Sequence, residues 1–111
     1  MTQPRQRLLA DLASNAAHVA GLEFEHARII AAAESSNGDD EHDPEGATIA
    51  YERQQAAALL EQARGRRRDL ERALDRLDRG TYGMCEQCGE PIVADRLEAR
   101  PSARTCLVCA T

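Results

Sequence analysis

The sequence contains no lysine and no tryptophan, one phenylalanine and two tyrosines among its 111 residues. So few bulky side chains exclude a large globular core, and the length allows one domain with at most a small appendage. All fourteen basic residues are arginine, a bias from which no mechanism follows. Alanine, leucine, arginine and glutamate dominate, a composition typical of long helices. A core this small favours an added source of stability, such as a metal site.

Long apolar runs are also absent. Residues 1–20 carry Asp11 and other polar side chains and lack the apolar segment of a signal peptide. No stretch approaches the roughly 20 apolar residues that a membrane span needs. The formal net charge of -5 argues against a protein that coats nucleic acid, and the arginine run within 64–68 is spread around a helix and followed by acids. We therefore expect a cytoplasmic protein that contacts neither membrane nor nucleic acid directly.

Four cysteines near the C-terminus carry the strongest chemical signal. They form two C-x-x-C pairs separated by seventeen residues, and they are Cys85, Cys88, Cys106 and Cys109. This spacing predicts a zinc site in which each pair lies on a tight turn and the four thiolates complete a tetrahedron. Four protein ligands leave no open position for water or substrate, so we expect one structural Zn²⁺ ion.

Two disulfides, or a redox-active C-x-x-C, would use the same residues. Disulfides are typical of small secreted domains, whereas this sequence shows no signal peptide and suits a reducing compartment. A redox-active pair usually accompanies a βαβ pattern, which the sequence does not show. Zinc is therefore favoured over both alternatives.

The residues before the cysteines predict a first long helix. From about residue 4 to residue 33, apolar side chains recur at the core positions of a heptad. Asn15 and His26 fall at the same positions, and we interpret them as residues that fix the register rather than as ligands. The segment at 35–38, with its glycine, ends this helix.

A second heptad pattern follows. Asp43 is a capping residue and Pro44 suits the first helical position, and the apolar repeat runs from Ile49 to Leu77 before Gly80 ends it. The linker of about nine residues favours an intramolecular antiparallel hairpin over an intermolecular coiled coil, so we expect a monomer. The predicted fold is mainly α, with a coiled-coil hairpin over residues 4–79 and a four-cysteine zinc finger over residues 80–111.

The turn of this hairpin is strongly acidic. Residues 34–46 hold six acids and no arginine, which accounts for the negative excess of the whole chain. Such a loop is commonly only solvated, and it lacks the ligand pattern of an EF-hand. Nothing in the sequence encloses a pair of carboxylates for catalysis, so an enzyme is not expected. An acidic tip on a narrow helix pair also suits insertion into a positively charged cavity or near a metal ion.

The residues around the cysteines closely resemble the zinc finger of the DksA/TraR family. The resemblance runs from Tyr82 to Gly89, continues at Ile92 and through Arg96–Pro101, and ends at the last two cysteines. Together with the acidic-tipped hairpin it covers most of the chain. It implies a regulator that binds bacterial RNA polymerase, inserts its hairpin into the secondary channel near the catalytic magnesium, and modulates initiation without binding DNA.

The family's tip element, Asp-x-Ala, falls on Glu45-Gly46-Ala47. The resemblance therefore implies a polymerase-binding tip made by Asp43, Glu45 and Ala47. Glu45 keeps the carboxylate on a side chain one methylene longer, and Gly46 loosens the first helical turn. A second family acid falls on His42, for which the adjacent Asp43 can substitute if the loop shifts. Because a displacement of about 1 Å can abolish such a function, the activity of this tip needs its own test.

The resemblance also implies a guanosine tetraphosphate site built from basic residues. Those positions are Asp69, Arg100 and Ala110 here, so only Arg100 keeps a positive charge and Asp69 would repel phosphate. We therefore expect an effect on transcription that is independent of this nucleotide. Arg100 is a candidate partner contact, with pairing to Glu90 or Glu98 as the structural alternative.

Two functions from different classes follow. The first is the polymerase-binding regulator. The second is a zinc-stabilised protein–protein interaction module, or a coiled-coil dimer, that keeps the fold without polymerase activity. A DNA-binding finger would need a basic recognition helix, and an enzyme would need a nucleophile that is not committed to metal. Charge reversal at Glu45 separates the first two functions, because only the regulator should respond.

Overall fold

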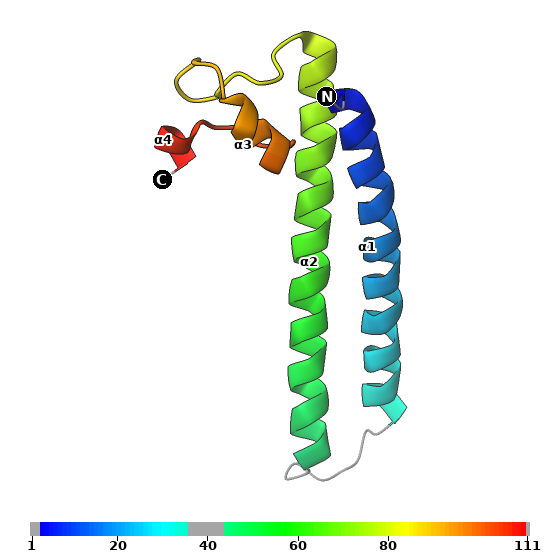
Figure 1. Cartoon of the computed structure of the whole chain (residues 1–111). Helices are drawn as coiled ribbons and strands as arrows, with labels where there is room; N and C mark the ends of the chain where they lie inside the picture. Colours follow the sequence, from blue (N-terminus) through cyan, green and yellow to red (C-terminus); the bar gives the residue numbers. More distant parts are fainter. Residues whose placement is uncertain (1–2, 36–43, 111) are drawn as a thin grey trace. The chain divides into compact units, whose positions relative to one another are not determined.

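The computed structural model describes residues 3–35 and 44–110, and these residues are mostly helical (Figure 1). The four helices are α1 (Pro4–Ser35), α2 (Pro44–Arg79), α3 (Ala94–Ala99) and α4 (Leu107–Ala110). Within the described ranges, the β pairing outside the helices is an isolated bridge between Met84 and Pro91. The mainly α fold class is therefore confirmed. No helix of this part of the chain is long and apolar enough to cross a membrane.

The chain divides into two compact units. One contains Asn15–Gly65, and the other combines Met1–Ser14 with Arg66–Thr111. Helices α1 and α2 each contribute a segment to both units, and within each unit the two segments lie side by side and run antiparallel (Figure 1). Each unit has its own apolar cluster, so the two are described separately.

In the unit Asn15–Gly65, the heptad positions form the core. Val19, Leu60 and Ala63 are buried, with Leu22 packed against them. Asn15 is only 4% exposed, and its Nδ2 donates a hydrogen bond to the Ala63 carbonyl oxygen at 3.0 Å. Its Oδ1 has no partner in the described structure. A polar group buried at one position fixes the alignment of two helices at some cost in stability, which supports the interpretation of Asn15 as a register residue.

In the other unit, the start of α1 packs against the end of α2. Leu8 and Leu70 are fully buried with Ala73 beside them, and the partly buried side chains around this cluster are Leu12, Leu74, Leu77 and Tyr82. Full burial of one leucine contributes about 1.5–3 kcal/mol. Tyr82 belongs to the segment that leads to the zinc site, so the same apolar cluster supports both the helix pair and the residues beyond it.

Helix α2 ends in a motif that redirects the chain toward the cysteines. Gly80 has a φ of 77°, in the left-handed region that favours glycine. The Gly80 N–H donates to the Leu77 carbonyl at 3.2 Å, and the Thr81 N–H donates to the Arg76 carbonyl at 2.9 Å. These two bonds form a Schellman motif, which satisfies carbonyls that the end of a helix would otherwise leave unpaired.

Candidate functional site

The four cysteines that the sequence singled out lie together, although the two pairs are far apart in the chain. Their Sγ atoms all lie within 4.8 Å of one another, and the Sγ atoms of Cys88 and Cys106 are 3.8 Å apart. A tetrahedral zinc ion with Zn–S bonds of about 2.3 Å places its sulfurs about 3.8 Å apart. The donor set and its spacing therefore fit one structural Zn²⁺ ion, as predicted.

The first cysteine pair lies on a tight turn held by the backbone. The Cys85 N–H donates to the Glu90 carbonyl at 2.8 Å, and the Gly89 N–H donates to the Cys85 carbonyl at 3.0 Å. Gly89 has a φ of 77°, which a residue with a side chain rarely adopts. The Ile92 N–H closes the turn on the Gly83 carbonyl at 2.7 Å. We call residues 83–92 the first knuckle.

The second pair lies at the start of α4. The Ala110 N–H donates to the Cys106 carbonyl at 2.9 Å, which places Cys106 and Cys109 on one helical turn. We call residues 104–110 the second knuckle. The Glu86 N–H donates to the Arg104 carbonyl at 2.9 Å and so joins the two knuckles, while Nε of Arg96 in α3 donates to the Thr105 carbonyl at 2.9 Å. The zinc ligands are therefore positioned by hydrogen bonds to the backbone on both sides of the site.

The surroundings of the sulfurs favour two thiolates over the others. Backbone N–H groups of Cys88 and Cys106 lower the pKa of Cys85 from 9.0 to about 6. The Cys109 backbone N–H lowers the pKa of Cys106. In contrast, the pKa of Cys109 is raised to about 12 by hydrogen bonds to the sulfurs of Cys106 and Cys85. Because a zinc-bound thiol is deprotonated, binding of the ion must displace protons, and affinity should fall as the pH falls.

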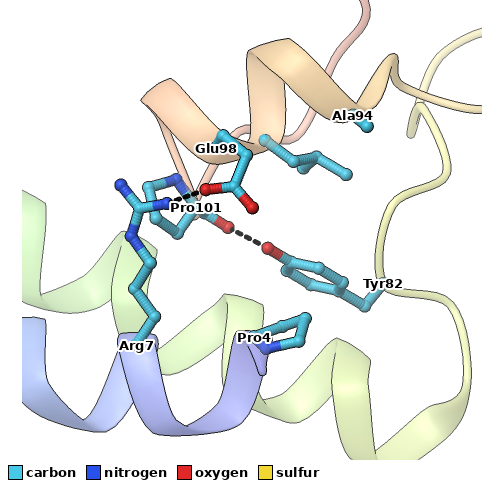
Figure 2. Close-up of a pocket in the computed structure, with 7 residues that line it drawn as sticks. Pro4, Arg7, Tyr82, Ala94, Glu98 and Pro101 are labelled. Carbon is cyan, nitrogen blue, oxygen red and sulfur yellow. Dashed lines mark hydrogen bonds and ion pairs between the residues drawn. The ribbon is translucent and has the colours of Figure 1, made fainter. Parts of the chain in front are cut away.

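A second set of contacts fastens α3 to the start of α1 around a cavity of about 170 Å³ (Figure 2). The Tyr82 hydroxyl donates to the Pro101 carbonyl at 2.8 Å, and Arg7 Nη1 lies 2.9 Å from Glu98 Oε2. Burial raises the pKa of Tyr82, which keeps the phenol in its donor form. The described partner of Glu98 is Arg7 in α1, which lies 91 residues away in the sequence, rather than the suggested Arg100.

Arg76 is a residue that the sequence analysis missed. It lies in the last turn of α2, is 9% exposed, and donates from Nη2 to the carbonyl oxygens of Thr81, at 3.0 Å, and Met84. Its Nη1 is 3.6 Å from Glu86 Oε1. Basic residues are common at helix C-termini, so the sequence gives no reason to expect this one to be buried. Its place outside the heptad positions even predicts an exposed side chain.

The predicted tip is only partly described. Asp43 lies outside the described residues, and Glu45 falls in the first turn of α2, where the backbone alone is described. Ala47 is exposed on α2. Arg100 is exposed and follows α3 directly, with its backbone N–H bonded to the Arg96 carbonyl at 2.7 Å. The polymerase-binding roles of these four residues stay predictions.

Comparison with known proteins relates the chain to one group. Residues 80–111 match the family described as "Prokaryotic dksA/traR C4-type zinc finger". The chain is 39% identical over 71 residues to General stress protein 16O of Bacillus subtilis, covering 64% of this chain and 44% of that protein. It is 50% identical over 50 residues to the RNA polymerase-binding transcription factor DksA of Caulobacter vibrioides, covering 41% of this chain and 35% of that protein. The chain thus aligns with less than half the length of these curated relatives.

The fold comparison extends over nearly the whole chain. The structure of transcription factor DksA2 from Pseudomonas aeruginosa superimposes with a TM-score of 0.78 at 29% sequence identity. The match covers 96% of this chain and 77% of that one. The similarity therefore includes both the long helices and the cysteine module.

Proposed function

We propose that this chain, whose residues 80–111 match the dksA/traR zinc-finger family, binds bacterial RNA polymerase and modulates transcription initiation by inserting the acidic end of its helix pair into the secondary channel. The observation that carries this proposal is the match to the DksA2 fold over 96% of the chain, in addition to the zinc-finger match. In this role the protein is a cytoplasmic monomer and not an enzyme. It recognises a protein partner and does not bind DNA directly.

The distribution of charge supports the proposed mode of binding. Residues 15–65, which include the acidic segment between α1 and α2, contain ten acids and three arginines. The remaining residues contain nine acids and eleven arginines. Charge of one sign at one part of a molecule steers it toward a partner site of the opposite sign. A cavity that holds a catalytic metal ion and binds nucleotides offers such a site.

The test is binding of the full zinc-loaded chain to core RNA polymerase, with a known secondary-channel ligand as competitor. We expect saturable binding that the competitor displaces. Glu45→Lys should change the effect on transcription by about tenfold, since like charges brought together at an interface cost more than 1.4 kcal/mol. Glu52→Lys, seven residues further along α2, changes the net charge equally and should have a smaller effect.

Absence of binding at tens of micromolar would contradict the proposal and favour the interaction module. Binding that the competitor does not displace would contradict the proposal in the same way. If the competitor displaces the protein but Glu45→Lys and wild type act alike on transcription, the protein binds in the secondary channel and the proposed role of the tip is wrong.

We further infer that guanosine tetraphosphate does not strengthen this effect. Of the three positions that the family uses for the nucleotide, Asp69 is acidic, Ala110 is apolar and only Arg100 is basic. One exposed arginine offers little to a polyphosphate, and an acid at a second position of the site would repel it. In a transcription titration we expect the same response with and without the nucleotide. A severalfold increase that disappears in Arg100→Ala would show that the site is retained.

A further inference from the structure

Arg76 connects α2 to the first knuckle in a way that no other described arginine does. Its guanidinium lies between the helix and the turn, bonded to the carbonyl oxygens of Thr81 and Met84 and close to the Glu86 carboxylate. Met84 and Glu86 are the residues on either side of the zinc ligand Cys85. One buried side chain therefore holds the backbone before the ligand and the side chain after it.

Burial makes these contacts necessary for Arg76. Its side chain is 11% exposed, so water cannot replace a lost partner, and an unpaired buried charge is strongly unfavourable. By comparison, Arg7 with its 33% exposed side chain joins α1 to α3 through an ion pair near the surface. Surface pairs contribute little to stability. Of the two arginines, Arg76 is therefore the one whose loss of partners, if the knuckle shifts, should destabilise the helix that carries it.

We propose that Arg76 is a positioning residue for the zinc site, which sets the metal affinity by holding Cys85 in place and couples zinc occupancy to the packing of the last turns of α2. Removing zinc frees the turn at Cys85, which displaces the Met84 carbonyl and Glu86 and leaves the guanidinium with the Thr81 carbonyl alone. Such coupling is reciprocal, so the contacts that zinc stabilises must also strengthen zinc binding.

The matched test compares Arg76→Gln with Arg79→Gln in the full chain. Arg79 lies in the same turn, but its side chain is 73% exposed and pairs with Asp75 at 3.0 Å, away from the knuckle. Zinc dissociation constants are measured by competition with a chromophoric chelator. Residues that orient metal ligands typically contribute ten- to a hundredfold in affinity, so we expect a loss of about that size for Arg76→Gln and a change within about twofold for Arg79→Gln.

A reference variant separates positioning from general destabilisation. Leu60→Ala weakens the separate buried cluster of residues 15–65, which contains no residue of either knuckle, and below its unfolding temperature this variant should bind zinc like wild type. Hydrogen exchange gives a second readout. In the wild type, removing zinc should accelerate exchange in the last two turns of α2, whereas in Arg76→Gln the metal should make a smaller difference.

The proposal is overturned if Arg76→Gln binds zinc within about twofold of wild type, or if Leu60→Ala loses as much affinity as Arg76→Gln. If Arg76→Gln does not fold even with zinc, Arg76→Lys replaces it. Lysine keeps the charge but lacks the planar fork that serves two carbonyls and a carboxylate, so we expect a loss of about three- to tenfold. Wild-type affinity in that variant would contradict the proposal.

Discussion

Replacing Cys85 by serine should abolish zinc binding and unfold residues 80–111. Cys85 is the most buried of the four ligands, at 4% exposed, and its sulfur has the strongest tendency to ionise. In small modules the binding free energy of a structural zinc ion, about 10–16 kcal/mol at neutral pH, is also folding free energy. The metal content should fall from one zinc per chain to none, and residues 80–111 should lose protection from hydrogen exchange and from proteases.

The rest of the protein should respond much less. Residues 15–65 have their own buried cluster of Val19, Leu60 and Ala63, so we expect most of the helical circular dichroism to remain. Gln87→Ser is the matched control, since this exposed residue lies between the ligands Cys85 and Cys88. It should keep one zinc ion. Full zinc content and unchanged protection in Cys85→Ser would refute the structural role of the metal.

Leu8→Ala should cost about 3 kcal/mol of the free energy of unfolding, whereas Leu9→Ala should cost less than about 1 kcal/mol. The two positions are adjacent on α1 and receive the same substitution. Leu8 is fully buried against Leu70 and Ala73, and Leu9 is 51% exposed. Because both changes alter helix propensity equally, the difference between them reports the burial alone.

Chemical denaturation of the zinc-loaded protein measures this difference. A small domain is stabilised by only about 5–15 kcal/mol, so Leu8→Ala should shift the midpoint clearly. Equal losses for the two variants would mean that the start of α1 does not pack against α2 as described. A loss confined to Leu9→Ala would mean that the helix is rotated from the described register.

The zinc site and the two long helices could be predicted because their signals are local. The spacing within each cysteine pair is that of a tight turn, and the apolar repeat is a property of one helix at a time. The apolar repeats contain residues that are buried in the structure, among them Leu8, Val19, Ala63 and Leu70. The family resemblance rests on the same local residues, which is why the comparisons confirm it.

The contacts of the arginines could not be predicted, because they depend on chain segments that are distant in the sequence or on burial. Nothing near Arg7 indicates that its partner is Glu98, and the sequence offered the nearby Arg100 as one possible partner of Glu98. Charged side chains of opposite sign can pair in many combinations of similar energy, so only the packing of backbone segments selects one.

By itself, then, the sequence determined which residues form helices, which four bind zinc and where the acidic charge is concentrated. These follow from periodicity, ligand chemistry and composition, which need no knowledge of the fold. Only the tertiary structure decided that Arg76 is buried against the carbonyl of Met84 and that Asn15 is bonded to Ala63. Burial gives these two polar side chains their importance, and burial results from how segments pack together rather than from any one of them.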